Sequence, residues 1–278
     1  MKNIFYTIIL SFLFSSVCLA DRELSIKEIE ILAEQGEPWA QSALRLEKTE
    51  ILAEQGDADA QYMLGELYYI GTEIYPHQDY KEAAKWYRLS AEQGNAEAQY
   101  NLAVMYLEGK GVKKDAKEAI KFFELASKQG HKDAPFYLGL YYYNDYQEQD
   151  YEEAVKWFRL GANRGDVMSL NQLAMLYYEG SGVMKSYEKA AELYLRGAEQ
   201  NNPKSQMNLA LLYLEGKGVI QDFVIGYMWL NISMRSHGEE KFYVMIRERH
   251  SKKMTPEQIT KAQELARQCI ESNYKDCG

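Results

Sequence analysis

Apolar and small residues recur with helical spacing along most of this chain, and the pattern itself returns about every 36 residues. Each copy holds a small residue, then Leu, a second small residue and Tyr at offsets of four, five and eight, which places the four on one helical face. The five stripes are Ala60, Leu64, Gly65 and Tyr68; Ala98, Leu102, Ala103 and Tyr106; Ala134, Leu138, Gly139 and Tyr142; Ser169, Leu173, Ala174 and Tyr177; and Ser205, Leu209, Ala210 and Tyr213. A second helix follows each stripe, so the pattern predicts five helix pairs.

The loops between the paired helices carry stop and start signals. Three copies contain Gly-x-Gly-Val, beginning at Gly109, Gly180 and Gly216. We expect the first Gly to end its helix in a left-handed conformation that other residues adopt at a cost. A residue suited to capping then precedes each second helix, where its side chain can accept hydrogen bonds from first-turn amides. These residues are Asp79, Asp115, Asp150, Ser186 and Asp222.

A closing phrase related to Ala-Glu-Gln-Gly stands directly before the first helix of every copy. Its versions occupy residues 53–56, 91–94, 127–130, 162–165 and 198–201. A fixed period in this range predicts a solenoid, in which each unit buries its apolar face only against its neighbours. Such an array presents an extended surface to which another molecule can bind.

The stripe, the Gly-x-Gly-Val loop, the Lys/Glu-Ala-aromatic second helix and the closing Ala-x-Gln-Gly together resemble the Sel-one-like repeat family, a branch of the tetratricopeptide-like solenoids. The match covers roughly residues 50–235, and the third copy departs by lacking both loop glycines. The resemblance implies an all-α fold, a right-handed superhelical solenoid of antiparallel helix pairs with about five full repeats and helical caps. It also implies an adaptor or scaffold, often in bacterial envelopes or export pathways.

The chain divides into four segments by pattern. Residues 1–20 are expected to be a signal peptide, 21–56 N-terminal capping helices or a compressed repeat, 57–236 the repeat solenoid, and 237–278 C-terminal capping helices. In the last segment, Thr255-Pro256-Glu257-Gln258 is a capping box with Pro at the first helical position. It predicts a final helix that covers the open end of the array.

The first segment has the three parts of a secretory signal. Lys2 provides the positive charge, residues 4–14 the apolar run, and Val17 and Ala20 the small-residue cleavage site. We therefore expect cleavage after Ala20 and a periplasmic or secreted protein without a membrane span. An uncleaved membrane anchor is the alternative.

Composition narrows the classes of partner. With 46% apolar residues the chain can build a core, and its formal net charge of −9 would repel phosphate backbones and anionic lipid. Nucleic acid is therefore not expected as a partner. Cys269 and Cys277 would remain after cleavage, and in an oxidising compartment an even pair predicts a disulfide; two free thiols are the alternative. Since the histidines are scattered, neither a metal site nor a cofactor is expected.

One short motif suggests chemistry. Ser186 and Lys189 fit Ser-x-x-Lys, the nucleophile motif of penicillin-binding enzymes. Ser186 also fills the slot that Asp occupies in the other copies, so we interpret it as a helix cap and expect no enzyme. A cell-wall, glycan or β-lactam enzyme of the envelope is kept as the weaker alternative, and a purely structural spacer as a third.

The residues of the first helices that point away from the buried stripe are the candidate binding surface. They are Tyr62, Met63, Glu66, Asn101, Val104, Phe136, Tyr137, Leu140, Asn171, Gln172, Met175, Met207, Asn208 and Leu211. First helices line the concave side in this architecture, and exposed aromatic and Met side chains are typical of protein and peptide sites. The hypothesis is a concave face that binds a protein or peptide. The alternative is that these residues pack against the neighbouring unit.

Overall fold

The computed structural model describes residues 26–71, 78–144, 150–237, 241–275 and 277, and within these ranges all regular structure is α-helical. The helices are α2 (Ile26–Glu34), α3 (Pro38–Glu54), α4 (Ala58–Ile70), α5 (Tyr80–Glu92), α6 (Ala96–Glu108), α7 (Ala116–Lys128), α8 (Ala134–Asn144), α9 (Tyr151–Asn163), α10 (Val167–Glu179), α11 (Tyr187–Glu199), α12 (Pro203–Glu215), α13 (Phe223–His237), α14 (Lys241–Ser251) and α15 (Pro256–Glu271). The expected signal peptide lies outside the described residues. Among the helices that are described, none is both long and apolar enough for a bilayer crossing.

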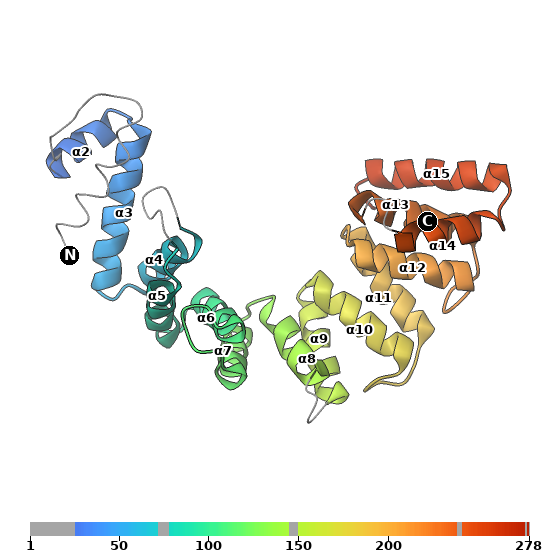
Figure 1. Ribbon diagram of the computed structural model, residues 1–278, viewed down its shortest axis with the longest axis horizontal. Coiled ribbons are helices and arrows are strands. Elements are labelled where there is room, and N and C mark those ends of the chain that lie inside the picture. Colours follow the sequence, from blue (N-terminus) through green and yellow to red (C-terminus); the bar gives the residue numbers. More distant parts are fainter. Residues whose placement is uncertain (1–25, 72–77, 145–149, 238–240, 276, 278) are drawn as a thin grey trace. The chain divides into compact units, whose positions relative to one another are not determined.

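The chain forms two compact units, residues 1–131 and 132–278. In the N-terminal unit each helix from α2 to α7 contacts the next one along the chain. In the C-terminal unit the same holds from α8 to α13, and α13 also contacts α14 and α15. Within each unit the helices form successive hairpins (Figure 1). The all-α solenoid class expected from the sequence is therefore confirmed.

The predicted helix starts and stops are confirmed. Asp79 and Asp115 each accept hydrogen bonds from two first-turn amides, and Asp150, Ser186 and Asp222 cap their helices in the same way. The first loop glycines are left-handed, with φ of 73°, 84° and 67°. The first helices therefore end, and the second helices begin, where the local sequence dictates.

A recurrent glutamine joins α3, α4, α6 and α12 to the helix that precedes each of them. In four places the side-chain Nε2 donates to the carbonyl oxygen of an Ala eight residues earlier, in the closing phrase. The pairs are Gln41 to Ala33, Gln61 to Ala53, Gln99 to Ala91 and Gln206 to Ala198. Because the first of these joins α3 to α2, the N-terminal capping helices use the same bond as the repeats.

The second loop glycine lets adjacent repeats approach closely. A Cβ on Gly111 would lie 1.9 Å from the carbonyl oxygen of Tyr80, at the start of the preceding repeat's second helix. Gly182 and Gly218 meet the backbone of the equivalent Tyr in the same way. The Gly-x-Gly loop is thus both a helix stop and a contact between repeats.

The C-terminal helices close the core of their unit. Trp229 of α13 is 1% exposed and lies in one apolar cluster with Ile246 of α14 and Ala266 of α15. The predicted capping box is present at the start of α15, with reciprocal bonds between Thr255 and Gln258. A disulfide joins Cys269 to Cys277, with the Cα atoms 4.8 Å apart, and ties the end of the chain to α15.

Candidate functional site on the first helices

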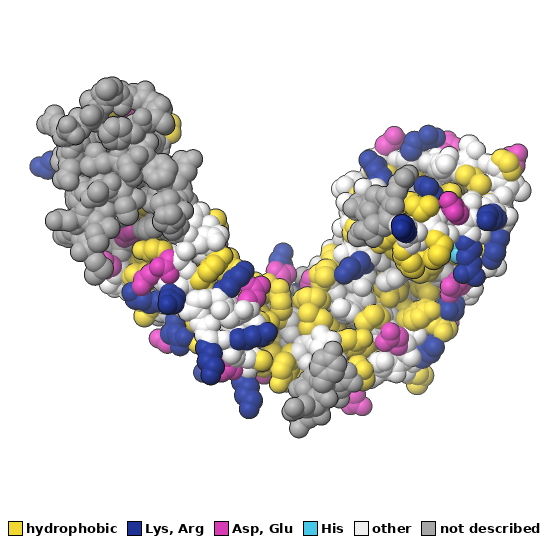
Figure 2. Space-filling view, viewed as in Figure 1, with side chains coloured by type: hydrophobic (Ala, Val, Ile, Leu, Met, Phe, Trp, Pro, Cys, Tyr) yellow, Lys and Arg dark blue, Asp and Glu magenta, His cyan; other side chains and the backbone are white. Residues whose placement is uncertain are grey.

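The sequence-predicted surface residues lie on α4 and α6 in the N-terminal unit and on α8, α10 and α12 in the C-terminal unit. Met63 is the most exposed of them at 48%, Met207 is buried, and the others are half-buried. Hydrophobic side chains stand exposed among charged ones on the visible face of each unit (Figure 2).

In the C-terminal unit, part of the predicted surface supports the core. Phe136, Leu140 and Leu211 are partly buried and pack against the main apolar cluster, as the packing alternative expects. Met207 is 5% exposed and belongs to that cluster, because α11 and α13 both pack on α12. The expectation that Met207 faces solvent is wrong. Tyr137, Gln172, Met175, Asn171 and Asn208 stay half-exposed.

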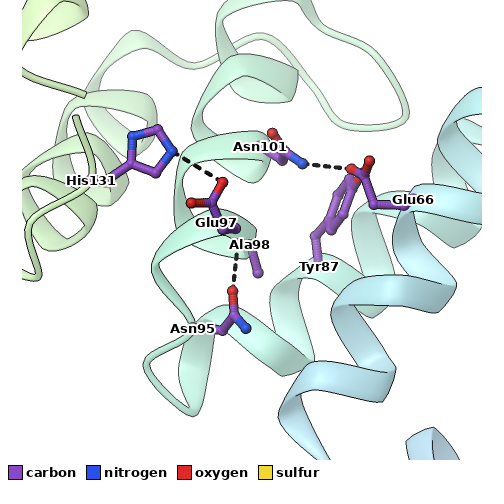
Figure 3. A network of polar contacts seen from close by, with 7 residues as sticks. All are labelled: Glu66, Tyr87, Asn95, Glu97, Ala98, Asn101 and His131. Atoms are coloured by element: carbon purple, nitrogen blue, oxygen red, sulfur yellow. Dashed lines mark hydrogen bonds and ion pairs between the residues drawn. The ribbon is translucent and has the colours of Figure 1, made fainter. Parts of the chain in front are cut away.

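In the N-terminal unit, the structure brings Glu66 and Asn101 together. Glu66 Oε1 accepts a hydrogen bond from Asn101 Nδ2 at 2.7 Å and another from the hydroxyl of Tyr87 (Figure 3). Glu66 comes from α4, Tyr87 from α5 and Asn101 from α6, so the network joins one repeat to the next. The sequence predicted Glu66 and Asn101 as surface residues. It did not predict Tyr87, which is buried in α5.

The electrostatics of this network follow from burial. Tyr87 is 0% exposed, and burial raises the pKa of its phenol, with the hydrogen bond to Glu66 and the Glu66 charge raising it further. Burial also raises the pKa of Tyr62, and the nearby charges of Glu66 and Glu97 add to this effect. Both phenols are therefore neutral at physiological pH, and that of Tyr87 acts as a hydrogen-bond donor.

A second polar contact lies along α6. Nε2 of His131 is 3.2 Å from Oε2 of Glu97, and the His131 ring stacks on Tyr100 with 4.2 Å between centroids (Figure 3 shows the His131–Glu97 pair). Tyr100 occupies the same repeat position as Tyr62 and Phe136, yet it was not among the predicted residues. Aligning the five first helices position by position would have identified it.

In the structure the side chain of Ser186 caps α11. Its hydroxyl accepts the amide hydrogen of Lys189 at 3.2 Å and donates to Glu188 at 2.9 Å, which is the capping role. Among the residues that the structure describes, no group of three His, Cys, Asp or Glu side chains could hold a metal ion.

Comparison with known proteins agrees with this architecture. The Sel1 repeat family model matches residues 58–95, 96–131, 133–166, 167–202 and 203–233. A crystal structure of a protective antigen from uropathogenic Escherichia coli strains, which displays an SLR fold, is 30% identical over 90% of this chain with a TM-score of 0.71. The chain spans 57% of the length of that protein.

A Sel1 repeat protein from Oxalobacter formigenes is 29% identical, with a TM-score of 0.63; the match covers 73% of this chain and 82% of that one. None of the curated proteins matches the chain. The five family matches together span more than half of the chain and begin and end within a few residues of the helix pairs described above. The chain therefore belongs to the Sel1 repeat family.

Proposed function

We propose that this chain is an exported scaffold or adaptor that binds a protein or peptide through the exposed face of its first helices. Family membership supports the general role, since Sel1 repeat proteins generally mediate protein interactions. The apolar run and cleavage site in residues 1–20 support export to the periplasm or beyond.

The observation that carries the proposal is the mixed character of the face on α4 and α6. Met63 is 48% exposed, and half-buried Tyr62, Glu66 and Asn101 lie around it on the same two helices. Interfaces are rich in aromatic and Met side chains with a few oriented polar groups. The C-terminal unit also has an aromatic and a polar side chain half-exposed on its first helices, Tyr137 and Gln172.

Cross-linking in the native envelope followed by mass spectrometry of the captured proteins tests the proposal. A Tyr137→Ala variant should weaken capture of the identified partner while leaving the melting temperature nearly unchanged, because the side chain is only partly buried. Leu102→Ala is the control, since Leu102 is 0% exposed and its truncation should cost about 2–5 kcal/mol of unfolding free energy. If Tyr137→Ala unfolds the protein but leaves the partner bound, the face is wrongly assigned.

A further inference from the structure

Glu66 is an exception at its position in the repeat. The equivalent residue in the other four first helices is apolar. Those residues are Val104, Leu140, Met175 and Leu211. A carboxylate stands only in the first repeat, and there it is half-buried and held by the hydroxyl of Tyr87 and the amide of Asn101.

Packing does not require this charge. In the second repeat the equivalents of Glu66 and Tyr87 are Val104 and Phe123, and that phenylalanine is fully buried. Replacing both members of a buried polar pair by apolar groups of similar shape is nearly neutral for stability. A half-buried carboxylate, by contrast, loses part of its hydration.

The buried tyrosine does not require the charge either. In the fourth repeat Tyr194 takes the place of Tyr87, Met175 that of Glu66, and Asn208 that of Asn101. Tyr194 is buried, at 4% exposure, and no carboxylate stands at position 175. Burial raises the pKa of its phenol, the Glu179 charge raises it further, and the Asn208 side chain lowers it. The fold therefore accommodates a buried tyrosine at this position without a carboxylate at the position of Glu66.

Glu66 also has no cationic side chain paired with it in the described part of the chain. Tyr87 and Asn101 both use Oε1, so Oε2 remains available. Tyr62 stands one turn earlier on α4, with its ring centroid 6.0 Å from that of Tyr87. The carboxylate and the aromatic ring thus share one helical face.

We infer that Glu66, with Tyr62 and Asn101, binds a cationic side chain of the protein partner, and that arginine fits best; this rests on the proposed function. A guanidinium can donate to Oε2 of Glu66 while stacking on the Tyr62 ring, which a compact ammonium does less well. Tyr87 and Asn101 hold the carboxylate in place before binding, which lowers the entropy cost of association. Glu97, near the same ring, adds to the negative field.

Titration with N-acetyl-arginine amide, followed by the NMR shifts of the Asn101 side-chain amide and the Tyr62 ring, tests the site. The wild-type protein should show saturable shifts, and N-acetyl-citrulline amide, which is neutral, should show none. Glu66→Gln should weaken binding at least about tenfold, the scale of one charge-assisted hydrogen bond. Glu92→Gln is the matched control, because it removes the same charge from an exposed position of α5 and should leave binding unchanged.

Glu66→Met copies the fourth repeat and should keep the fold while losing arginine binding, which separates binding from stability. Absence of saturable shifts in the wild-type protein, or equal binding by the Glu66→Gln variant, overturns the cation site. If a captured partner binds the Glu66→Gln variant as well as wild type, the scaffold function stands and the inference fails. If arginine amide binds through Glu66 but no partner is ever captured, the site stands and the proposed function fails.

Discussion

At the scale of single residues, glycines in this chain have two different roles. Some only supply a positive φ, and others also leave room for the backbone of a neighbouring repeat. Gly111 has φ of +68° and its Cα faces the Tyr80 carbonyl of the preceding repeat. Gly130 closes a repeat with φ of +93°, but a Cβ there would meet nothing within 4 Å. The fourth repeat has Asn201 at the equivalent position with φ of +58°, so a side chain is tolerated there.

Alanine substitutions should separate these roles. Gly130→Ala should cost about 1–2 kcal/mol of unfolding free energy for the positive φ alone. Gly111→Ala should cost about 1–3 kcal/mol more, because the new methyl group forces two backbones apart. Chemical denaturation of both variants measures the difference. Equal losses would show that the close contact with Tyr80 contributes nothing.

At the scale of the element, the helices begin where one short polar side chain satisfies the first-turn amides. The second helices use the predicted Asp and Ser caps. Four first helices, α4, α6, α10 and α12, use Asp57, Asn95, Asp166 and Asn202, which directly follow the closing phrase and accept first-turn amides in the same way. These four caps could have been predicted from the same rule that identified the others.

Substitutions of Ser186 distinguish a role as a helix cap from a role as a catalytic nucleophile. Ser186→Ala should cost about 1 kcal/mol of stability through loss of the Lys189 amide bond. Ser186→Asp should restore it, since the third repeat already combines Asp150 with Glu152 at the spacing of Ser186 and Glu188. Thermal unfolding measures both variants. Turnover of a chromogenic β-lactam that disappears in both variants would instead support the enzyme alternative.

At the scale of the whole molecule, the stability of each helix should depend mainly on the helices that it contacts. From α2 to α7 and from α8 to α13 each helix contacts the next along the chain, and the boundary between the two compact units falls between His131 and Lys132 in the sequence. In such arrays stability is approximately a sum of repeat and nearest-neighbour terms. A core mutation should therefore lower the stability of its own repeat and of the adjoining helices, and leave distant repeats unchanged.

Hydrogen exchange of Leu102→Ala should show this locality. Leu102 is fully buried in α6, so the amides of α5, α6 and α7 should lose about 2–5 kcal/mol of opening free energy. The amides of α10 to α12, in the other unit, should keep their wild-type protection. A uniform loss across both units would mean that the chain unfolds as one cooperative body, contrary to this expectation.

The sequence by itself determined the helix pairs, their caps and the repeat family, because these depend on residues within a few positions of one another. The stripe around Leu102, the cap at Ser186 and the capping box at Thr255 are signals of this kind, and the structure confirms each. Disulfide pairing of Cys269 with Cys277 was accessible for the same reason, since they are close in sequence.

Only the tertiary structure decided which first-helix residues are available and what they touch. Met207 and Asn171 occupy equivalent repeat positions, yet one is buried and the other half-exposed, because burial depends on the neighbouring helices. The network of Glu66, Tyr87 and Asn101 spans 35 residues of sequence, and no local pattern links its members. Local rules fix where a helix begins and ends, whereas the contacts between repeats fix which side chains remain for a partner.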